Sequence, residues 1–331
     1  MMPERVVGGD DGLSVRFWGT RGSLPMPGSD TIVYGGNTCC VEVRLGDRLF
    51  VVDAGSGFEA AGRALALLGS GSGRVDLLLS HLHHDHISGL PFFAPILKGP
   101  GELRVFCGNL GGESAAAAFG TMFAPPLFPV TLDVLPGHIA HVGFRAGETL
   151  TFEDGVSVAT CPLRHPGGAT AYRFDHGGRS VCYVSDMEHV DTGPDADVVA
   201  FCRGADLVIY DAMFTEAELS RCRGWGHSTW NAGVDLCRAA GAEALAAFHH
   251  HKGHDDAALA AIEAELAEAL PGSFVAREGQ TLTFPARRSR EGGGLVSARG
   301  GRRRTGEPPE ARLPGARSPA GRVKNPHFEH G

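Results

Sequence analysis

The stretch Ser80–Leu90, SHLHHDHISGL, places four histidines and an aspartate in the six positions from His81 to His86. It follows the apolar run VDLLLS, which is typical of a buried strand, so these side chains lie where a strand gives way to a loop. His81 and His83 are two residues apart, a spacing that points both imidazoles the same way in extended chain. Asp85 and His86 come after the turn. The stretch predicts a metal site, and its donors favour zinc, with manganese or iron as alternatives.

Three further strand ends carry residues of the same kind. His165 closes an apolar run in CPLRHPGG, Asp186 does so in VCYVSDMEH, and His249 does so in LAAFHHHKGHDD. A single histidine at a strand end is commonly structural, but several that come after a dense histidine cluster favour ligand roles. Because one loop cannot complete a metal site, these three residues are the candidate partners of the loop.

Outside the histidine loop, β-rich runs alternate with Ala-rich runs. Apolar runs closed by Gly, Asp or polar clusters predict strands at 13–19, 39–45, 48–55, 75–80, 102–108, 156–161, 170–174, 180–185 and 206–212. Helices are predicted at 58–69, 112–123, 197–205, 228–241 and 255–270. Strands followed by helices in both halves predict an α/β fold of two mixed sheets face to face with helices outside, an αββα sandwich. The alternative is one doubly wound sheet, which would need fewer hairpin-like strand pairs.

The charges of the chain are unevenly distributed. Residues 286–331 contain 11 Lys and Arg against 4 Asp and Glu, a formal charge of +7, which leaves −15 on residues 1–285 of a chain with net charge −8. The tail is rich in Gly, Pro and Arg and has few large apolar residues, so we expect it to be disordered. Residues 1–13 are expected to be a flexible N-terminus. Contact with nucleic acid is therefore possible only through the basic tail.

The sequence also bears on location and redox state. No segment approaches the roughly 18 apolar residues of a membrane span, and the start lacks a run of signal-peptide length, so a cytoplasmic protein without membrane contact is expected. Eight cysteines are scattered without a C-x-x-C pair, which favours reduced core cysteines over disulfides or a thiolate metal site. The adjacent Cys39 and Cys40 cannot readily bridge, because neighbours on a strand point to opposite faces.

The ordered set of candidate ligands carries a resemblance. The pattern His81-x-His83-x-Asp85-His86, followed by His165, Asp186 and His249, resembles the metallo-β-lactamase superfamily of dinuclear metal-dependent hydrolases. The resemblance covers about residues 14–285 and implies a hydrolase domain of the metallo-β-lactamase fold there. Asp53, in VVDAGSG, fits the early aspartate of that family, which supports the metal loop.

The resemblance implies two divalent metal ions. One would be held by His81, His83 and His165, and the other by Asp85, His86 and His249, with Asp186 as the bridge. His250 and His251 follow directly, so the last ligand position stays open by one or two residues. His83 stands where related diiron redox proteins have Glu, which favours hydrolysis. Two ions about 3.5 to 4 Å apart can share a hydroxide and clamp the oxygens of an in-line displacement, and Asp85 could orient that hydroxide.

Two later stretches bear on the substrate. Asp211 ends the run LVIYD, and His227-Ser228-Thr229 precedes a predicted helix; a carboxylate that orients an imidazole is a recognised general-acid arrangement. These stretches are similar to the HEAT and HST loops of the tRNase Z and cyclic-phosphate phosphodiesterase branch, with Asp211 in place of the usual Glu. The resemblance implies phosphodiester hydrolysis, with His227 and Asp211 assisting the leaving group. Only a hairpin fits between His165 and Asp186, where tRNase Z carries a long arm, so a small or cyclic phosphodiester or nucleotide is expected.

Other functions remain open from the sequence. The same metals could serve a lactonase, a thioesterase or a β-lactamase-like enzyme. A different class is a non-catalytic nucleic-acid-binding module that uses the basic tail. The aromatic and Pro-rich segment 119–136 could form a lid or a subunit contact, so a homodimer is possible, and His189 could lie near the metals.

Overall fold

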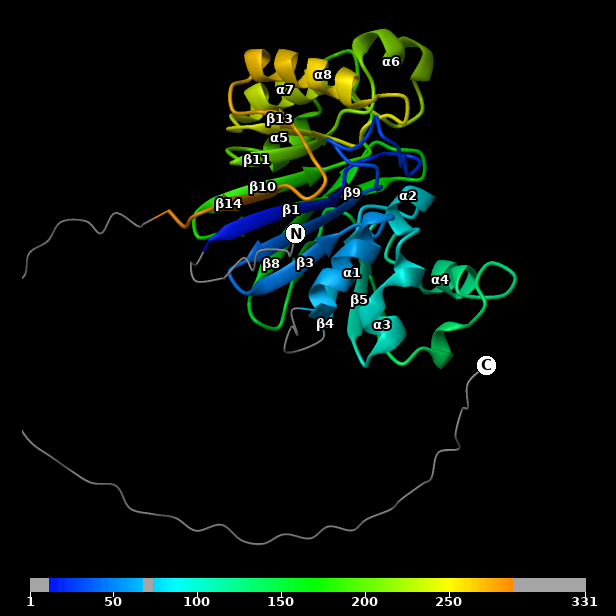
Figure 1. Cartoon of the computed structure of the whole chain (residues 1–331). Coiled ribbons are helices and arrows are strands. Elements are labelled where there is room, and N and C mark those ends of the chain that lie inside the picture. The colour runs from blue at the N-terminus through cyan, green and yellow to red at the C-terminus, as the bar shows by residue number, and fades with distance from the viewer. Residues whose placement is uncertain (1–11, 68–73, 288–331) are drawn as a thin grey trace, which may run out of the picture. The chain divides into compact units, whose positions relative to one another are not determined.

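Two seven-stranded β-sheets organise the described residues, 12–67 and 74–287, of the computed structural model (Figure 1). The first sheet contains, in spatial order, β14 (Thr281–Phe284), β1 (Leu13–Gly19), β2 (Cys40–Leu45), β3 (Arg48–Val52), β4 (Arg74–Leu79), β5 (Glu102–Cys107) and β6 (His138–Gly143). The second contains β13 (Phe274–Val275), β12 (Leu245–Phe248), β11 (Leu207–Asp211), β10 (Arg179–Val184), β9 (Ala169–His176), β8 (Ser157–Leu163) and β7 (Thr149–Thr151). Both sheets mix antiparallel and parallel pairs. The predicted architecture of two mixed sheets is confirmed, and the alternative of a single doubly wound sheet is wrong.

The sheets pack face to face through side chains from alternate strand positions. In β1, Leu13, Val15 and Phe17 are fully buried in the cluster that both sheets share. Phe50 of β3 and Phe174 of β9 meet across the interface, with ring centroids 5.7 Å apart. Burial of each such side chain stabilises the fold by about 1.5 to 3 kcal/mol. This inner core holds the ends of the two sheets at fixed positions relative to each other.

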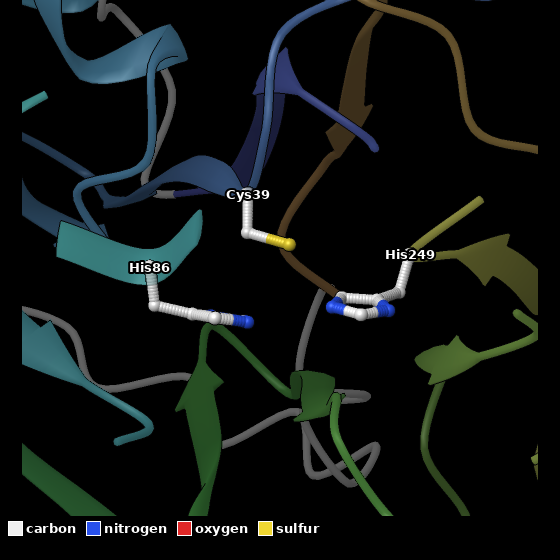
Figure 2. Close-up of side chains that lie close together, drawn as sticks. All are labelled: Cys39, His86 and His249. Carbon is white, nitrogen blue, oxygen red and sulfur yellow. The ribbon is translucent and has the colours of Figure 1, made fainter. Parts of the chain in front are cut away.

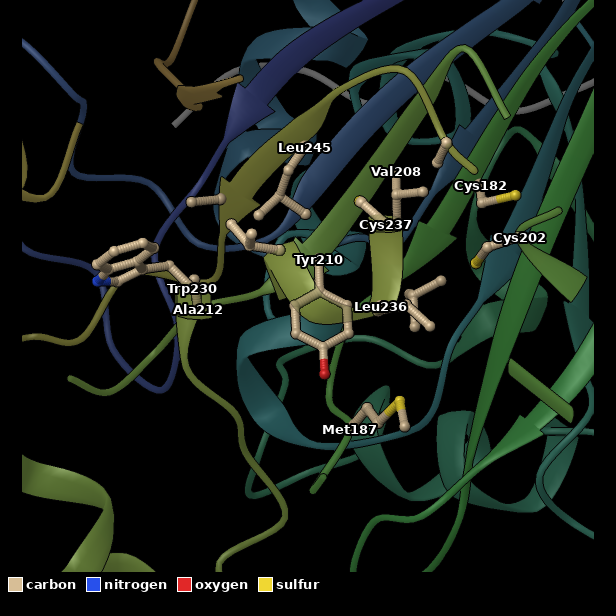
Figure 3. Packing of buried hydrophobic residues seen from close by; sticks show 14 of the residues in the cluster. Cys182, Met187, Cys202, Val208, Tyr210, Ala212, Trp230, Leu236, Cys237 and Leu245 are labelled. Atoms are coloured by element: carbon tan, nitrogen blue, oxygen red, sulfur yellow. The ribbon is translucent and has the colours of Figure 1, made fainter. Parts of the chain in front are cut away.

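Helices cover the outer face of each sheet (Figure 1). The outer face of the first sheet packs against α1 (Gly57–Leu67), α3 (Ala94–Lys98) and α4 (Ala116–Met122). That of the second packs against α5 (Ala196–Phe201), α7 (Trp230–Ala240) and α8 (Asp256–Ala269), around a cluster that includes Tyr210 and Leu236 (Figure 3). Thr229 and Asp255 cap α7 and α8, since each side chain accepts a hydrogen bond from a backbone N–H of the first turn. The four layers follow the order helix, sheet, sheet, helix.

Several short elements were not predicted from the sequence. They are β6, β7, β13, β14, α3 and α6 (Glu216–Cys222), together with the 3-10 turns Leu90–Phe92 and Leu132–Val134. The predicted loop after β4 also contains a single helical turn, α2 (His84–Ile87). Each of the six residues of β6 is at least partly exposed, so its sequence lacks the apolar run of a central strand.

Some predictions fall wholly or partly outside the described residues. The structure does not describe residues 1–11 of the predicted flexible N-terminus (1–13) or residues 288–331 of the predicted disordered basic tail (286–331). Within the described ranges, no helix is both long enough and apolar enough to span a bilayer. The segment 119–136 exposes Leu127 and Val134, and its role as a lid or subunit contact stays a prediction. The domain boundaries, the homodimer and the cytoplasmic location also stay predictions.

Candidate metal centre

The candidate ligands meet where strands of both sheets end. His81 comes after β4, Asp186 after β10 and His249 after β12. Carboxyl ends of parallel strands lie at one edge of a sheet, which is where α/β folds place their sites. His165 joins them because β8 is antiparallel to β9, and β9 is antiparallel to β10, so β8 runs in the direction of β10. Asp211, the last residue of β11, reaches the same edge.

One group consists of His81, His83 and His165. Their rings lie 4.3 to 4.9 Å apart between centroids. The closest polar atoms, Nε2 of His165 and Nδ1 of His83, are 3.1 Å apart. Gly226 accepts a hydrogen bond from His165 Nδ1 through its carbonyl, at 2.8 Å, which leaves Nε2 to face the other two rings. The His83 side chain is exposed, so this group lies at the solvent side of the site.

A second group consists of Asp85, His86 and His249. Oδ2 of Asp85 lies 3.2 Å from His249 Nε2 and 3.4 Å from His86 Nε2. Asp186 lies between the two groups: its Oδ1 is 3.3 Å from His249 Nε2 and 3.8 Å from Nε2 of both His81 and His165. Asp186 therefore has a central position, and its role as a shared ligand stays a prediction.

The backbone around the second group is held in an uncommon conformation. Of the residues that the structure describes, four other than glycine have positive φ: Ser23 (63°), Asp53 (60°), Asp186 (61°) and His249 (60°). Side chains with a Cβ rarely adopt this region, and such residues cluster at functional sites. All four touch or flank the candidate ligands. A close approach at Gly22 adds to this constraint, because a Cβ there would lie 2.3 Å from the His249 ring.

Asp53 anchors the histidine loop from behind. It is fully buried after β3, and its carboxylate accepts hydrogen bonds from His86 Nδ1 (2.7 Å), Tyr183 Oη (2.7 Å) and the backbone N–H of Ser80 (2.7 Å). The Nδ1 bond fixes the His86 tautomer so that Nε2 faces Asp85 and Asp186. Asp53 itself therefore supports a ligand, as predicted from its position, while Tyr183 was not anticipated.

Electrostatics differ between the two groups. Burial lowers the pKa of His81, His83 and His165, and neighbouring histidines add to the effect at each. Burial also disfavours the charged form of His86 and His249, but the nearby carboxylates, Asp186 first among them, hold the pKa of both well above the usual value. The His86 and His249 rings in turn hold the pKa of Asp186 well below its usual value. The first group thus favours neutral imidazoles, whereas the second pairs two histidines with carboxylates, those of Asp85 and Asp186, whose pKa values are held below the usual value.

The residues present fit divalent metal ions. Nε2 of His81 and Nε2 of His86 are buried and make no hydrogen bond within the described part of the chain. Buried polar atoms in folded proteins normally have a hydrogen-bond partner, and both of these nitrogens instead face carboxylate oxygens of Asp186, at 3.1 Å for His86 and 3.8 Å for His81, as donors around a shared cation would. Donor atoms of His81, His83 and His165 lie within 4.8 Å of one another, as do those of His81, His86 and Asp186. Imidazole and carboxylate donors at such spacing suit zinc, and also manganese or iron.

Asp211 and His227 form a pair at the rim of the site. Oδ2 of Asp211 lies 2.8 Å from Nδ1 of His227, so the shorter side chain still reaches the ring. Asp211 is fully buried and also accepts from the backbone N–H of Met213, whereas the His227 side chain is 12% exposed. The His227 ring stacks on His249 with centroids 4.8 Å apart. This geometry fixes Nδ1, which also lies 3.7 Å from Asp186 Oδ1, and places the His227 ring beside the ligand groups.

Three histidines outside the candidate groups have partners of their own. His250 points away from the ligand groups, and its Nε2 lies 2.8 Å from the Ala276 carbonyl. His254 pairs with Glu218 at 3.0 Å. His189 is 2.7 Å from the Ser228 hydroxyl, next to the Asp211–His227 pair, and its role at the site stays a prediction. His249 is therefore the member of the triple histidine run that joins the candidate ligands.

Residues from the loop between β1 and β2 also reach the site, although no pattern in the sequence pointed to them. The backbone N–H of Ser23 donates to Asp85 Oδ2 at 2.6 Å. Cys39, at the end of the same loop, lies beside His86 and His249. Neither follows an apolar strand, which was the criterion for the other candidates.

Comparisons with known proteins identify the family and agree with the fold. A family model described as a β-lactamase superfamily domain matches residues 48–250. Ribonuclease Z of Halobacterium salinarum is 27% identical over an alignment that covers 82% of this chain and 98% of that protein. The crystal structure of human tRNase Z, short form, superposes with a TM-score of 0.59 at 20% identity, covering 82% and 99% of the two chains. A diphosphatase from the PhnP family gives 0.57 at 20% identity, covering 83% and 98%.

Proposed function

The chain belongs to the metallo-β-lactamase superfamily, and we propose that it is a metal-dependent phosphodiesterase that acts on a small or cyclic phosphodiester or nucleotide. Similarity to ribonuclease Z supports the choice of phosphorus over carbonyl substrates. The observation that carries the proposal is the 2.8 Å contact between Asp211 and His227 beside the ligand groups, because it adds a proton donor for a leaving oxygen.

In this proposal, two divalent ions are held by the chain. His81, His83 and His165 hold one, Asp85, His86 and His249 hold the other, and Asp186 faces both. When bound, the ions supply an activated water and neutralise charge on the phosphate. Asp85 also accepts from the Ser23 N–H, which fixes the orientation of its carboxylate towards the site.

The protein residues then divide the remaining work. Asp211 holds His227 Nδ1–H, so Nε2 is the atom that donates a proton to the leaving oxygen. The carbonyl of Gly226, directly before His227, binds the His165 ring, so the proton donor and one ligand group are tied to the same loop.

The short connection between His165 and Asp186 supports a small substrate. That connection consists of β9 and β10, joined by a two-residue turn at Gly177 and Gly178. A short hairpin offers no extended arm to grip a folded nucleic acid at this edge. We therefore expect a small phosphodiester rather than a precursor tRNA.

Relative rates on a substrate panel test the proposal. Bis-p-nitrophenyl phosphate and a cyclic nucleotide should be hydrolysed faster than any member of a lactone and thioester panel, and a precursor tRNA should stay intact. Asp186→Ala protein, which lacks the central ligand, serves as the control for contaminating phosphodiesterase. Faster turnover of a lactone would assign the site to carbonyl chemistry, and binding of RNA without turnover of any substrate would support a binding module.

A further inference from the structure

A cysteine from outside the predicted ligand set lies at the second group. Cys39 is fully buried directly before β2, and its side chain points between the rings of His86 and His249 (Figure 2). Its Sγ and one ring nitrogen of each histidine all lie within 4.8 Å of one another. Three atoms at that spacing are within about 2.8 Å of a common centre, so shifts of about 0.5 to 0.8 Å would bring them to the Zn–S and Zn–N distances of about 2.3 and 2.0 Å.

The second observation at this place is an unpartnered nitrogen. Nε2 of His86 is buried and lies 3.1 Å from Asp186 Oδ2, but it makes no hydrogen bond of proper geometry with the described residues, while its Nδ1 is committed to Asp53. Nε2 of His86 and the Cys39 thiol thus converge with His249 on the same space. Because a buried imidazole nitrogen normally has a partner, the convergence points to a ligand rather than to packing alone.

The competing explanation is an ordinary core cysteine. The Cys39 thiol lies 3.3 Å from the Arg21 carbonyl and can donate a hydrogen bond to it. Cys39 also lies in the apolar cluster between the two sheets, with Phe17 and Phe248, whereas its equally buried neighbour Cys40 belongs to the cluster on the outer face of the first sheet. The two adjacent cysteines therefore face opposite sides of β2, and Cys39 is the one whose sulfur meets histidine nitrogens.

We propose that Cys39 supplies a thiolate to the metal ion held by Asp85, His86 and His249, and so makes this position selective for zinc. On binding, the S–H bond breaks, its proton passes to solvent, and a sulfur–metal bond forms in place of the hydrogen bond to Arg21. A thiolate is a soft donor that favours zinc or cobalt over manganese and magnesium. The inference rests on the proposed two-ion site and specifies the metal of one position.

Cobalt substitution tests the proposal through a signal that does not depend on activity. Protein loaded with Co²⁺ should show a near-ultraviolet sulfur-to-cobalt charge-transfer band in addition to the visible bands of the ion. Cys39→Ser should lose the near-ultraviolet band while keeping visible cobalt bands. The matched control, Cys40→Ser, should keep both. Cys39→Ala gives a second variant with no oxygen donor and should also lose the near-ultraviolet band.

The outcomes separate this inference from the proposed function. If wild-type protein binds two Co²⁺ ions but shows no charge-transfer band, or if the band survives in folded Cys39→Ser and Cys39→Ala protein, Cys39 is not a ligand and the two-ion site stands. If wild-type protein binds no metal, the proposed function fails together with the inference. Circular dichroism spectra like those of wild-type protein establish that each variant is folded.

Discussion

The buried carboxylates of this molecule have two different kinds of partner. At the carboxyl ends of the strands, Asp186 is surrounded by histidines, and the Nε2 atoms of His81 and His86 remain without hydrogen bonds in the described chain. Elsewhere in the two sheets, buried carboxylates are matched by arginines. Asp76 of β4 pairs with Arg48 and Arg104, and Asp206 pairs with Arg179 and Arg287.

The contrast separates stability from function. An arginine placed on a buried carboxylate satisfies its charge within the chain, and the pair needs nothing further. The histidine region leaves donors unsatisfied and also contains the four positive-φ residues, Ser23, Asp53, Asp186 and His249. Backbone strain together with buried histidine nitrogens that lack hydrogen bonds indicates a binding site for a cation. The arginine-paired carboxylates, in contrast, stabilise the sheets.

The largest expected effect comes from removing the central carboxylate. Asp186→Ala should abolish retention of both ions and lower phosphodiesterase turnover by several kcal/mol of transition-state stabilisation, on the order of 10⁴ in rate. Metal analysis and kinetics on the same preparation measure both. Full activity in a metal-depleted Asp186→Ala protein would contradict the claim that the histidine region, unlike the arginine-paired carboxylates, binds metal for catalysis.

The next effect concerns the proton donor. His227→Ala should lower turnover of a cyclic nucleotide roughly 10²- to 10³-fold, and should change turnover of bis-p-nitrophenyl phosphate much less, because nitrophenolate leaves without protonation. Metal content should be unchanged. His189→Ala, which removes a histidine 2.7 Å from Ser228 in the same neighbourhood, is the matched control. Equal losses on both substrates would mean that His227 is not a general acid.

A smaller effect is expected at Asp53, which bonds to the candidate ligand His86. Asp53→Asn keeps the shape of the side chain but weakens its bond to His86 Nδ1, so metal affinity should fall roughly 10- to 100-fold. Competition with a chromophoric chelator measures this change. The rate at saturating metal should recover towards the wild-type value, and a permanent loss at saturation would place Asp53 in the reaction itself.

The smallest effect should appear in an arginine-paired region. Asp206→Asn should lower the free energy of unfolding by about 1 to 3 kcal/mol without changing metal content or turnover. Burial raises the pKa of Asp206, but hydrogen bonds from Arg179 and the Ser180 N–H outweigh it and hold the pKa below its usual value of 3.8. A depressed carboxyl pKa stabilises the fold above that value, and the contribution is lost as pH falls below it.

Urea denaturation between pH 3 and pH 7 checks the sign of this contribution. Wild-type protein should lose its advantage over Asp206→Asn as the carboxyl becomes protonated at the acidic end. An advantage that grew on acidification would contradict the assignment of the ion pairs.

The fold and the candidate ligands were accessible from the sequence because both depend on strand ends. Apolar runs locate the central strands, and polar residues directly after them gather at one edge by topology. The sequence could not choose among His249, His250 and His251, because the choice depends on the positive φ of His249, after which His250 turns to Ala276. The prediction of reduced core cysteines agrees with the buried, free Cys39, but its approach to the histidines was not predicted, because it depends on the path of a loop.

Edge elements escaped prediction for a related reason. β6 and β7 lie at sheet edges and contain no fully buried residue, so they lack the apolar pattern that marks central strands. α6 is short and strongly polar, and it is held by the Thr215–Glu218 capping box rather than by a wide apolar face.

The metal content of wild-type protein, purified without chelator, tests the central claim most directly. Elemental analysis should find close to two divalent ions per chain, with zinc as the main metal, and their removal should abolish phosphodiester turnover until metal is restored. Fewer than about one ion per chain, together with undiminished turnover after treatment with a chelator, would contradict the account.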